Sequence, residues 1–204
     1  MRVVFLGTSE FAIPSLRSLN RSKNHNIEFV ITQPDSPQGR GLKVLPSPVK
    51  IEALKKTIPV IQPGKITSSV IRNIISESKA DIIFCAAYGE FLPETILGSL
   101  PFGAINLHPS RLPLYRGAAP VQRALMEGCD EIAVTFIQMA REMDAGDILL
   151  QKKLIILPEE TAGDLLTRTA ELGGDLLPGL LDDLEEGKIV PIRQDHTKAT
   201  FAPV

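Results

Sequence analysis

Two polar residues at the end of an apolar strand are the clearest sign of chemistry in this chain. Residues 103–107 form a short apolar run that leads directly into His108 and a proline-rich stretch. Side chains alternate along a strand, so Asn106 and His108 point to the same side. An amide donor beside a titratable imidazole, at a strand end that enters a loop, indicates catalysis more than packing. For a lone histidine, a hydrogen bond to the backbone would be the simpler interpretation.

A carboxylate partner for the imidazole is expected in the loop of residues 140–147, which joins two predicted strands. This loop contains Asp144 and Asp147. A carboxylate next to His108 would favour the charged imidazole and fix the orientation of its ring. Asp144 is the better candidate, because Asp147 follows a glycine and suits a capping or strand-start position equally well. Spacing alone leaves both residues open.

These residue types favour direct transfer between two bound substrates. The pattern contains neither an activated nucleophile nor a set of metal ligands. Ser110 lies near His108 but lacks the strand-turn-helix elbow that exposes a nucleophilic serine, so we expect it to be a hydrogen-bonding loop residue. For an attacking amine, His108 would handle the proton and Asp144 would support the imidazolium. The Asn106 amide would donate to the oxyanion of a tetrahedral intermediate.

The elements that must position these side chains alternate between strands and helices. Short apolar runs predict strands that are buried on both faces, and helix-patterned segments lie between them. The alternation predicts an α/β fold with a mostly parallel sheet, in which ligands bind beyond the carboxyl ends of the strands. The expected strands are 3–6, 27–32, 81–87, 103–107, 132–139 and 148–156, and the expected helices are 10–19, 49–56, 68–78, 118–127 and 162–186.

Local signals refine this prediction. Gly7 suits the turn from the first strand into the first helix, with Ser9 as its cap. One glycine at this turn excludes a nicotinamide dinucleotide site, because that fingerprint needs three. Thr161 and Asp164 have the spacing of a helix capping pair, and Pro178 should break or kink the long helix that follows them.

Residues 34–50 form a connection without helix or strand periodicity that is rich in proline and glycine. Connections longer than about 12 to 15 residues in a compact domain tend to be functional or disordered. Arg40 lies between two glycines and Lys43 follows closely, which suits a flexible basic finger. A simply solvated loop is the alternative, and the residues alone leave both readings open.

Composition limits the class of protein. The chain has 204 residues, of which 44% are hydrophobic and 23% charged, and this favours a single globular domain. A net charge of -2 argues against binding nucleic acid through a bulk field. Two distant cysteines predict a reduced, cytoplasmic protein without a metal site. The apolar N-terminal run is too short for a signal peptide or a membrane span, so we expect no membrane attachment.

Several motifs, in order along the whole chain, resemble the methionyl-tRNA formyltransferase family. The resemblance implies a Rossmann-like sheet with the formyltransferase fold. It also implies transfer of a formyl group from 10-formyltetrahydrofolate to the amino group of methionine on initiator tRNA. The motifs include Asn106-Leu107-His108, Leu112-Pro113-Leu114-Tyr115-Arg116-Gly117-Ala118-Ala119-Pro120, Met143-Asp144-Ala145-Gly146-Asp147 and pieces at 5–16, 32–35, 39–41, 46–50 and 87–93.

The resemblance also implies roles for individual residues. Asn106, His108 and Asp144 match the family's catalytic triad. Tyr115 and Arg116 should brace the loop after His108. The remaining assignments are folate contacts at Ser110, Arg111, Leu112 and Pro113, a pterin pocket lined mostly by the backbone of Ala86, Ala87, Tyr88, Gly89 and Leu92, a basic tRNA-contacting finger with Arg40 and Lys43, and a methionine pocket bounded by Phe11.

The sequence departs from the family pattern at two positions and leaves two alternatives open. Arg111 stands where leucine is usual and Ser9 where proline is common, which puts the folate contact and the first turn in doubt. A sugar-nucleotide N-formyltransferase or a non-catalytic folate-binding module would also fit, although Gln122 and the 39–41 finger favour the tRNA enzyme. Because residues 190–204 match the start of a linker to a C-terminal domain, we expect a monomeric catalytic domain that binds tRNA weakly.

Overall fold

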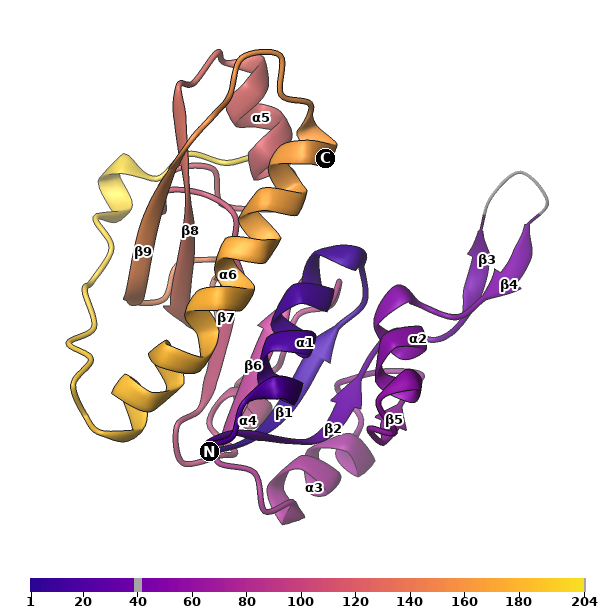
Figure 1. The fold of residues 1–204 in the computed structure, drawn as a ribbon. Coiled ribbons are helices and arrows are strands. Elements are labelled where there is room, and N and C mark those ends of the chain that lie inside the picture. The colour runs from indigo at the N-terminus through magenta and orange to yellow at the C-terminus, as the bar shows by residue number, and fades with distance from the viewer. Residues whose placement is uncertain (39–41, 204) are drawn as a thin grey trace.

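The computed structural model describes residues 1–38 and 42–203, in which strands and helices alternate as predicted (Figure 1). The strands are β1 (Arg2–Gly7), β2 (Asn26–Ile31), β3 (Ser36–Gln38), β4 (Lys43–Leu45), β5 (Val60–Ile61), β6 (Ile82–Ala86), β7 (Ala104–His108), β8 (Glu131–Gln138) and β9 (Ile148–Ile155). The helices are α1 (Ile13–Arg21), α2 (Pro48–Lys55), α3 (Ser69–Glu77), α4 (Glu94–Leu97), α5 (Pro120–Met126) and α6 (Ala162–Glu185), with short 3-10 turns η1 (Glu10–Ala12) and η2 (His196–Lys198).

The main sheet has the strand order β5-β2-β1-β6-β7-β8-β9. Its first five strands pair in parallel, and β8 pairs antiparallel with both β7 and β9. The predicted mostly parallel α/β sheet is therefore confirmed. Crossover helices account for the parallel part, since parallel neighbours cannot be joined by a tight hairpin.

Helices cover both faces of this sheet. β1 is buried on both sides, because Val3 and Phe5 belong to the core that packs under α1, α2 and α6. Val4 and Leu6 belong to a second core under α3 and α4. The expectation of two buried faces is wrong for β9, an edge strand along which Lys152, Lys153 and Ile155 are exposed.

The connection at residues 34–50 differs from its prediction. Residues 36–38 and 43–45 pair with each other as the antiparallel hairpin β3-β4, so the expected absence of strand structure is wrong. Three-residue strands give too short a pattern to detect, and Pro37 weakens the signal further. Arg40 and its two flanking glycines lie outside the described residues.

Two of the three predicted helix signals differ in the structure. Thr161 and Asp164 form the expected capping box at the start of α6. Ser9 precedes η1 in an extended conformation, but its side chain makes no capping hydrogen bond. The expected break at Pro178 is absent, because α6 is continuous from Ala162 to Glu185, and a kink there stays a prediction.

Burial explains why α6 continues through Pro178. A proline inside a helix costs about 3 kcal/mol, whereas each fully buried leucine contributes about 1.5 to 3 kcal/mol. The proline is flanked by Leu177, Leu180 and Leu181, which are all buried in the core under α1, α2 and α6. Their combined contribution outweighs the hydrogen bond that Pro178 cannot donate.

Candidate active site

A cavity of about 1290 Å³ opens at the carboxyl ends of the parallel strands. Its wall includes Thr8 after β1, Tyr88 after β6 and His108 at the end of β7. The loop before β9 and the first turns of α6 close its other sides. The cavity therefore lies where an open α/β sheet is expected to bind ligands.

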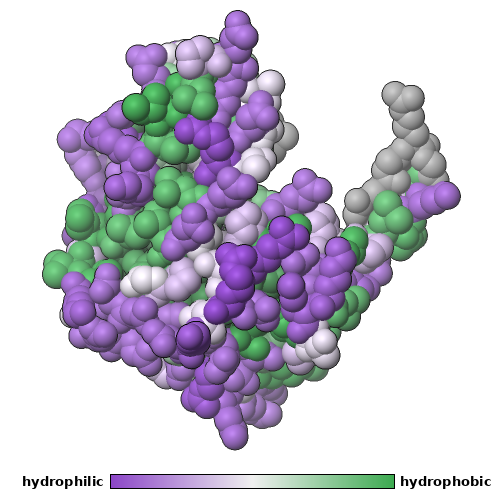
Figure 2. All heavy atoms as spheres, in the orientation of Figure 1, coloured by the Kyte–Doolittle hydropathy of each residue, from purple (hydrophilic) through white to green (hydrophobic). Residues whose placement is uncertain are grey.

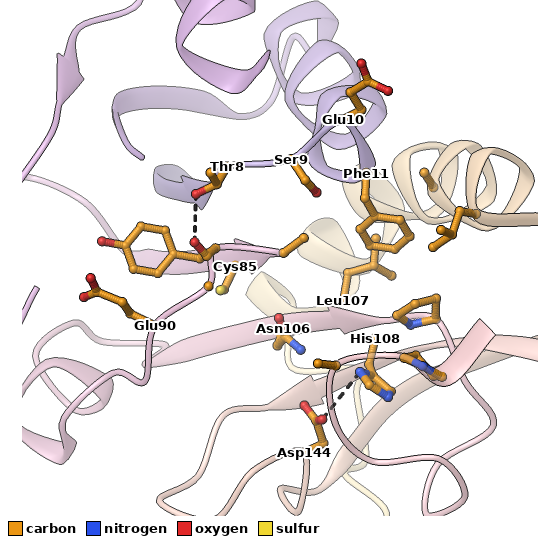
Figure 3. A pocket seen from close by; sticks show the side chains of 18 of the residues that line it. Thr8, Ser9, Glu10, Phe11, Cys85, Glu90, Asn106, Leu107, His108 and Asp144 are labelled. Atoms are coloured by element: carbon orange, nitrogen blue, oxygen red, sulfur yellow. Dashed lines mark hydrogen bonds and ion pairs between the residues drawn. The ribbon is translucent and has the colours of Figure 1, made fainter. Parts of the chain in front are cut away.

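His108 is held through both of its ring nitrogens and is only 4% exposed. Nε2 lies 2.9 Å from the backbone carbonyl oxygen of Tyr115. A carbonyl can only accept, so Nε2 carries a proton, and the neutral ring keeps its lone pair on Nδ1. Nδ1 lies 3.6 Å from Oδ2 of Asp144, and a dashed line marks this pair in Figure 3. The nitrogen that can take up a proton therefore faces a carboxylate.

The structure places Asp144, and not Asp147, beside the imidazole. Oδ2 of Asp144 also accepts a hydrogen bond of 2.8 Å from the backbone N–H of Gly117. Asp147 is exposed and does not line the cavity. Asp144 adopts a left-handed backbone conformation with φ of 51°, which is uncommon for a residue other than glycine and is frequent at functional sites.

Asn106, which lies on the same strand as His108, is the third polar residue beside His108 and Asp144. It is half-buried, and it lines the cavity. Within the described part of the chain, its side-chain amide makes no hydrogen bond, so the N–H groups can donate to a bound substrate. The alternation of β7 thus brings together the two residues that the sequence paired, and Asp144 reaches them from a distant loop (Figure 3).

Cys85 also lines the cavity, which the sequence did not suggest. It lies next to Asn106 in the register of β6 and β7. Burial raises the pKa of the Cys85 thiol to about 12, and the Asp144 carboxylate adds to the increase. A thiol with this pKa stays protonated near neutral pH and is a poor nucleophile. Because Cys85 is not an activated nucleophile, direct transfer between two bound substrates remains the simplest chemistry for this site.

No group of three or more His, Cys, Asp and Glu side chains within residues 1–38 and 42–203 could hold a metal ion. Across the same residues, no helix combines the length and the hydrophobicity that a membrane span needs.

The segment after β6 offers backbone groups to a ligand. Ala87, Tyr88, Gly89 and Leu92 line the cavity, whereas Ala86 is fully buried and does not. Thr8 holds the segment, since its N–H donates to the Ala87 carbonyl (3.2 Å) and its hydroxyl to the Tyr88 carbonyl (2.7 Å; Figure 3). The backbone of residues 89–92 makes no hydrogen bond within the described part of the chain. Those peptide groups are available for recognition.

Residues 1–181 match the model of the family described as Formyl transferase. The chain belongs to the formyl transferase family.

Curated relatives are similar to the chain over its full length. A methionyl-tRNA formyltransferase from Desulfotalea psychrophila is 44% identical over 204 residues, covering 100% of this chain and 63% of the relative. One from Dictyoglomus thermophilum is 45% identical over 205 residues, covering 100% of this chain and 65% of the relative. The chain thus spans slightly less than two thirds of the length of these relatives.

Solved structures share the formyl transferase fold at low sequence identity. Glycinamide ribonucleotide transformylase 1 from Symbiobacterium toebii superposes with a TM-score of 0.76 at 19% identity, covering 96% of this chain and 94% of that one. Methionyl-tRNA formyltransferase from Clostridium thermocellum has a TM-score of 0.66 at 16% identity, covering 100% and 72%. The predicted formyltransferase fold is therefore confirmed.

The predicted folate stretch of this formyl transferase lies outside the cavity wall. Ser110 is fully buried, and its hydroxyl donates to the Leu114 carbonyl at 2.7 Å. Arg111 is exposed and pairs with Glu131 at 2.8 Å. Leu112 is buried, Pro113 is half-buried, and neither lines the cavity. The folate role of these four residues stays a prediction that this geometry does not support.

The outer wall of the cavity contains aromatic residues at two places. Phe11 in η1 is half-buried, packs against the main core and lies near Leu107 (Figure 3). Phe91 is 64% exposed at the opening, and sequence reasoning did not single it out.

The loop after His108 is braced by Tyr115 and Arg116. The Tyr115 carbonyl accepts a hydrogen bond from His108, and Arg116 donates a hydrogen bond of 2.7 Å to Gln194.

The hairpin β3-β4 stands apart from the body of the molecule (Figures 1 and 2). Lys43 is exposed on β4. The base of the hairpin is fixed by Lys50, whose ammonium lies 2.7 Å from a carboxylate oxygen of Asp35. This hydrogen bond from Lys50 lowers the pKa of Asp35, as does the Gln62 amide. Lys43 thus places a positive charge beyond the edge of the cavity, on a hairpin whose base is fixed by the ion pair of Lys50 with Asp35.

Proposed function

We propose that this chain transfers a formyl group from 10-formyltetrahydrofolate to the amino group of methionyl initiator tRNA. The observation that carries the proposal is the meeting of Asn106, His108 and Asp144 in one cavity. Identities of 44% and 45% to methionyl-tRNA formyltransferases, over essentially the whole chain, support this choice of acceptor.

The arrangement can perform amine formylation without a covalent enzyme intermediate. As the amine nitrogen attacks the formyl carbon, its surplus proton moves to Nδ1 of His108. The Asp144 carboxylate, 3.6 Å away, stabilises the resulting imidazolium. The Asn106 amide donates to the oxygen of the tetrahedral intermediate. One such donor is typically worth about 10² to 10³ in rate, and a positioned acid–base group about 10² to 10⁴.

Collapse of the intermediate completes the transfer. The bond between the formyl carbon and N10 of the folate breaks, and the electron pair goes to N10. His108 returns its proton to that nitrogen, so the ring is again neutral and tetrahydrofolate leaves. The Nε2–H to Tyr115 bond persists throughout and keeps the ring in one orientation.

The two substrates are assigned to different parts of the cavity. The pterin ring of the donor would bind the open peptide groups of residues 89–92, beside Ala87 and Tyr88. The methionine side chain would lie against Phe11 and the apolar side chains of α6. Lys43 on the hairpin, together with Arg40, would contact the phosphates of the tRNA acceptor end.

An acceptor comparison tests the proposal. The chain is incubated with 10-formyltetrahydrofolate and, separately, with methionyl-tRNA, a dTDP-amino sugar or glycinamide ribonucleotide. We expect formylated methionyl-tRNA alone. A product only with the amino sugar would identify a sugar N-formyltransferase, and no product with any acceptor would leave a folate-binding module.

His108→Ala separates chemistry from donor binding. We expect kcat to fall by about 10² to 10⁴, because the imidazole acts mainly in the transition state. Folate affinity, measured by calorimetry, should stay within about threefold. A variant that loses folate binding instead would make His108 a ligand-binding residue.

A further inference from the structure

We propose that Gln194 is a positioning residue for Asp144. We also propose that residues 190–203, which we name the strap, fix the loops of residues 140–147 and 115–119 in place around His108. The proposal rests on the catalytic roles given above to Asp144 and His108. Figure 1 shows the strap, in yellow, running back from the end of α6 past β9. Gln194 lies beyond residue 181, where the match to the family model ends.

The side chain of Gln194 is fully used in hydrogen bonds. It is 4% exposed. Its Nε2 donates to the backbone carbonyls of Asp144 (2.8 Å) and Gly146 (2.7 Å). Its Oε1 accepts from Nη2 of Arg116 at 2.7 Å. The carbonyls can only accept and the guanidinium can only donate, so one orientation of the amide satisfies all three groups.

The loop that carries Asp144 needs this support. Asp144 has a left-handed backbone, a conformation that persists only where the surroundings impose it. Gly146 presses so closely on the carbonyl oxygen of Gln138 that no Cβ could fit. Without Gln194, the Asp144 carbonyl would lose its hydrogen-bond partner among the described residues. The amide thus holds the backbone from which the carboxylate reaches His108.

The strap also holds the loop of residues 115–119, which faces His108 from the other side. Thr200 accepts at its hydroxyl from the Tyr115 N–H and at its carbonyl from the Arg116 N–H, both at 2.8 Å. Ala202 donates to the Arg116 carbonyl at 2.7 Å and accepts from the Ala119 N–H at 2.9 Å. This loop supplies the Tyr115 carbonyl to His108. It also supplies the Gly117 N–H to Asp144.

The strap therefore contacts both loops that hold the imidazole of His108, the one with Asp144 and the one with Tyr115. Gln194 fixes the Asp144 side, and Thr200 with Ala202 fixes the Tyr115 side. Gln194 does not line the cavity, so it acts through Asp144 and does not touch substrate. Small displacements of a reacting group can cost about 10² in rate, which gives a distant amide a measurable effect on turnover.

Gln194→Glu is the sharpest test, because glutamate is isosteric and still accepts from Arg116. It lacks the two N–H groups that hold Asp144 and Gly146. We expect kcat for formyl transfer to fall by about 10- to 100-fold, with KM for donor and acceptor within about threefold. Val190→Ala, a change at an exposed position of the strap, should leave both parameters unchanged.

Hydrogen exchange supplies a readout that does not depend on activity. In Gln194→Glu, the amide of Gly117 should exchange roughly tenfold faster as its Asp144 acceptor moves, while β1 amides stay protected. If Gln194→Glu proves insoluble, Gln194→Met removes the same donors without adding charge. Unchanged kcat and exchange would overturn the proposal, as would loss of protection throughout the sheet. A wild-type chain without formyl transfer would reject the proposed function, while exchange would still test the strap.

Discussion

At the scale of single residues, hydrogen-bond directions decide which nitrogen of His108 would act in the proposed chemistry. The Tyr115 carbonyl fixes the proton on Nε2 of His108, so Nδ1 is the basic nitrogen. Asp144 faces that nitrogen and is itself held by the Gly117 N–H. The proposed proton transfer would therefore depend on the charge of Asp144 as well as on its position.

Asp144→Asn separates charge from position. The amide oxygen can still accept from Gly117, but the charge that stabilises the imidazolium is gone. We expect kcat to fall by about 10² or more, with folate affinity nearly unchanged. Steady-state kinetics with methionyl-tRNA would measure this, and Asp147→Asn, an exposed position outside the cavity, is the matched control. Equal losses in the two variants would argue against the assigned role.

The sequence predicts neighbours in the site well when they are close together in the chain, and poorly when they are far apart. Asn106 and His108 follow from the alternation of one strand, which is a local property. From spacing, Asp144 could only be preferred over Asp147, because no single sequence measures a distance across the fold, and it was the family resemblance that singled out Asp144. Gln194 and Cys85 gave no signal, since their places beside the site depend on how distant segments of the chain pack together.

At the scale of elements, α6 approaches both β7 and α1 closely through two glycines. A Cβ on Gly173 would overlap the side chain of Leu107, the residue between Asn106 and His108. A Cβ on Gly174 would lie 2.7 Å from the backbone of Pro14 in α1. These two glycines therefore allow α6 to lie directly against α1 and the side chain of Leu107 on β7.

Gly174→Ala and Gly179→Ala form a matched pair in α6. At Gly174 the backbone of Pro14 cannot yield as a flexible side chain would, so we expect a loss of about 1 to 3 kcal/mol in the free energy of unfolding. At Gly179 a Cβ meets nothing within 4 Å, so alanine should stabilise the helix by about 0.5 to 1 kcal/mol. Urea denaturation measures both, and changes of the same sign would contradict this packing.

Longer elements could be predicted from the sequence and the shortest could not. The six long strands were found to within a few residues because each is a continuous apolar run, and the five helices because each carries a helical pattern of apolar residues. The two residues of β5 and the three-residue strands of the hairpin carry too few. Pro178 misled the prediction, since its local cost is outweighed by the buried leucines around it.

At the scale of the whole molecule, the proposed tRNA contact is separated from the chemistry. The net charge of -2 gives no general attraction for nucleic acid. The hairpin projects away from the body (Figure 2), and Lys43 on β4 is exposed. Affinity for tRNA should therefore depend on a few local cations, while turnover on the acceptor amine depends on the cavity.

Lys43→Ala tests this separation by comparison with Lys152→Ala, which removes the same charge from the exposed edge strand β9. A lysine that neutralises one phosphate releases about one counterion, so its loss should weaken tRNA binding and reduce the slope of log affinity against log salt by about 1. Filter binding at several salt concentrations measures that slope. Formylation of a minimal methionyl ester should be unchanged in both variants, because neither lysine lines the cavity. Equal slopes for the two variants would mean that the hairpin does not contact the phosphates, whereas a Lys43→Ala defect with the minimal ester would place its effect in the catalytic cavity.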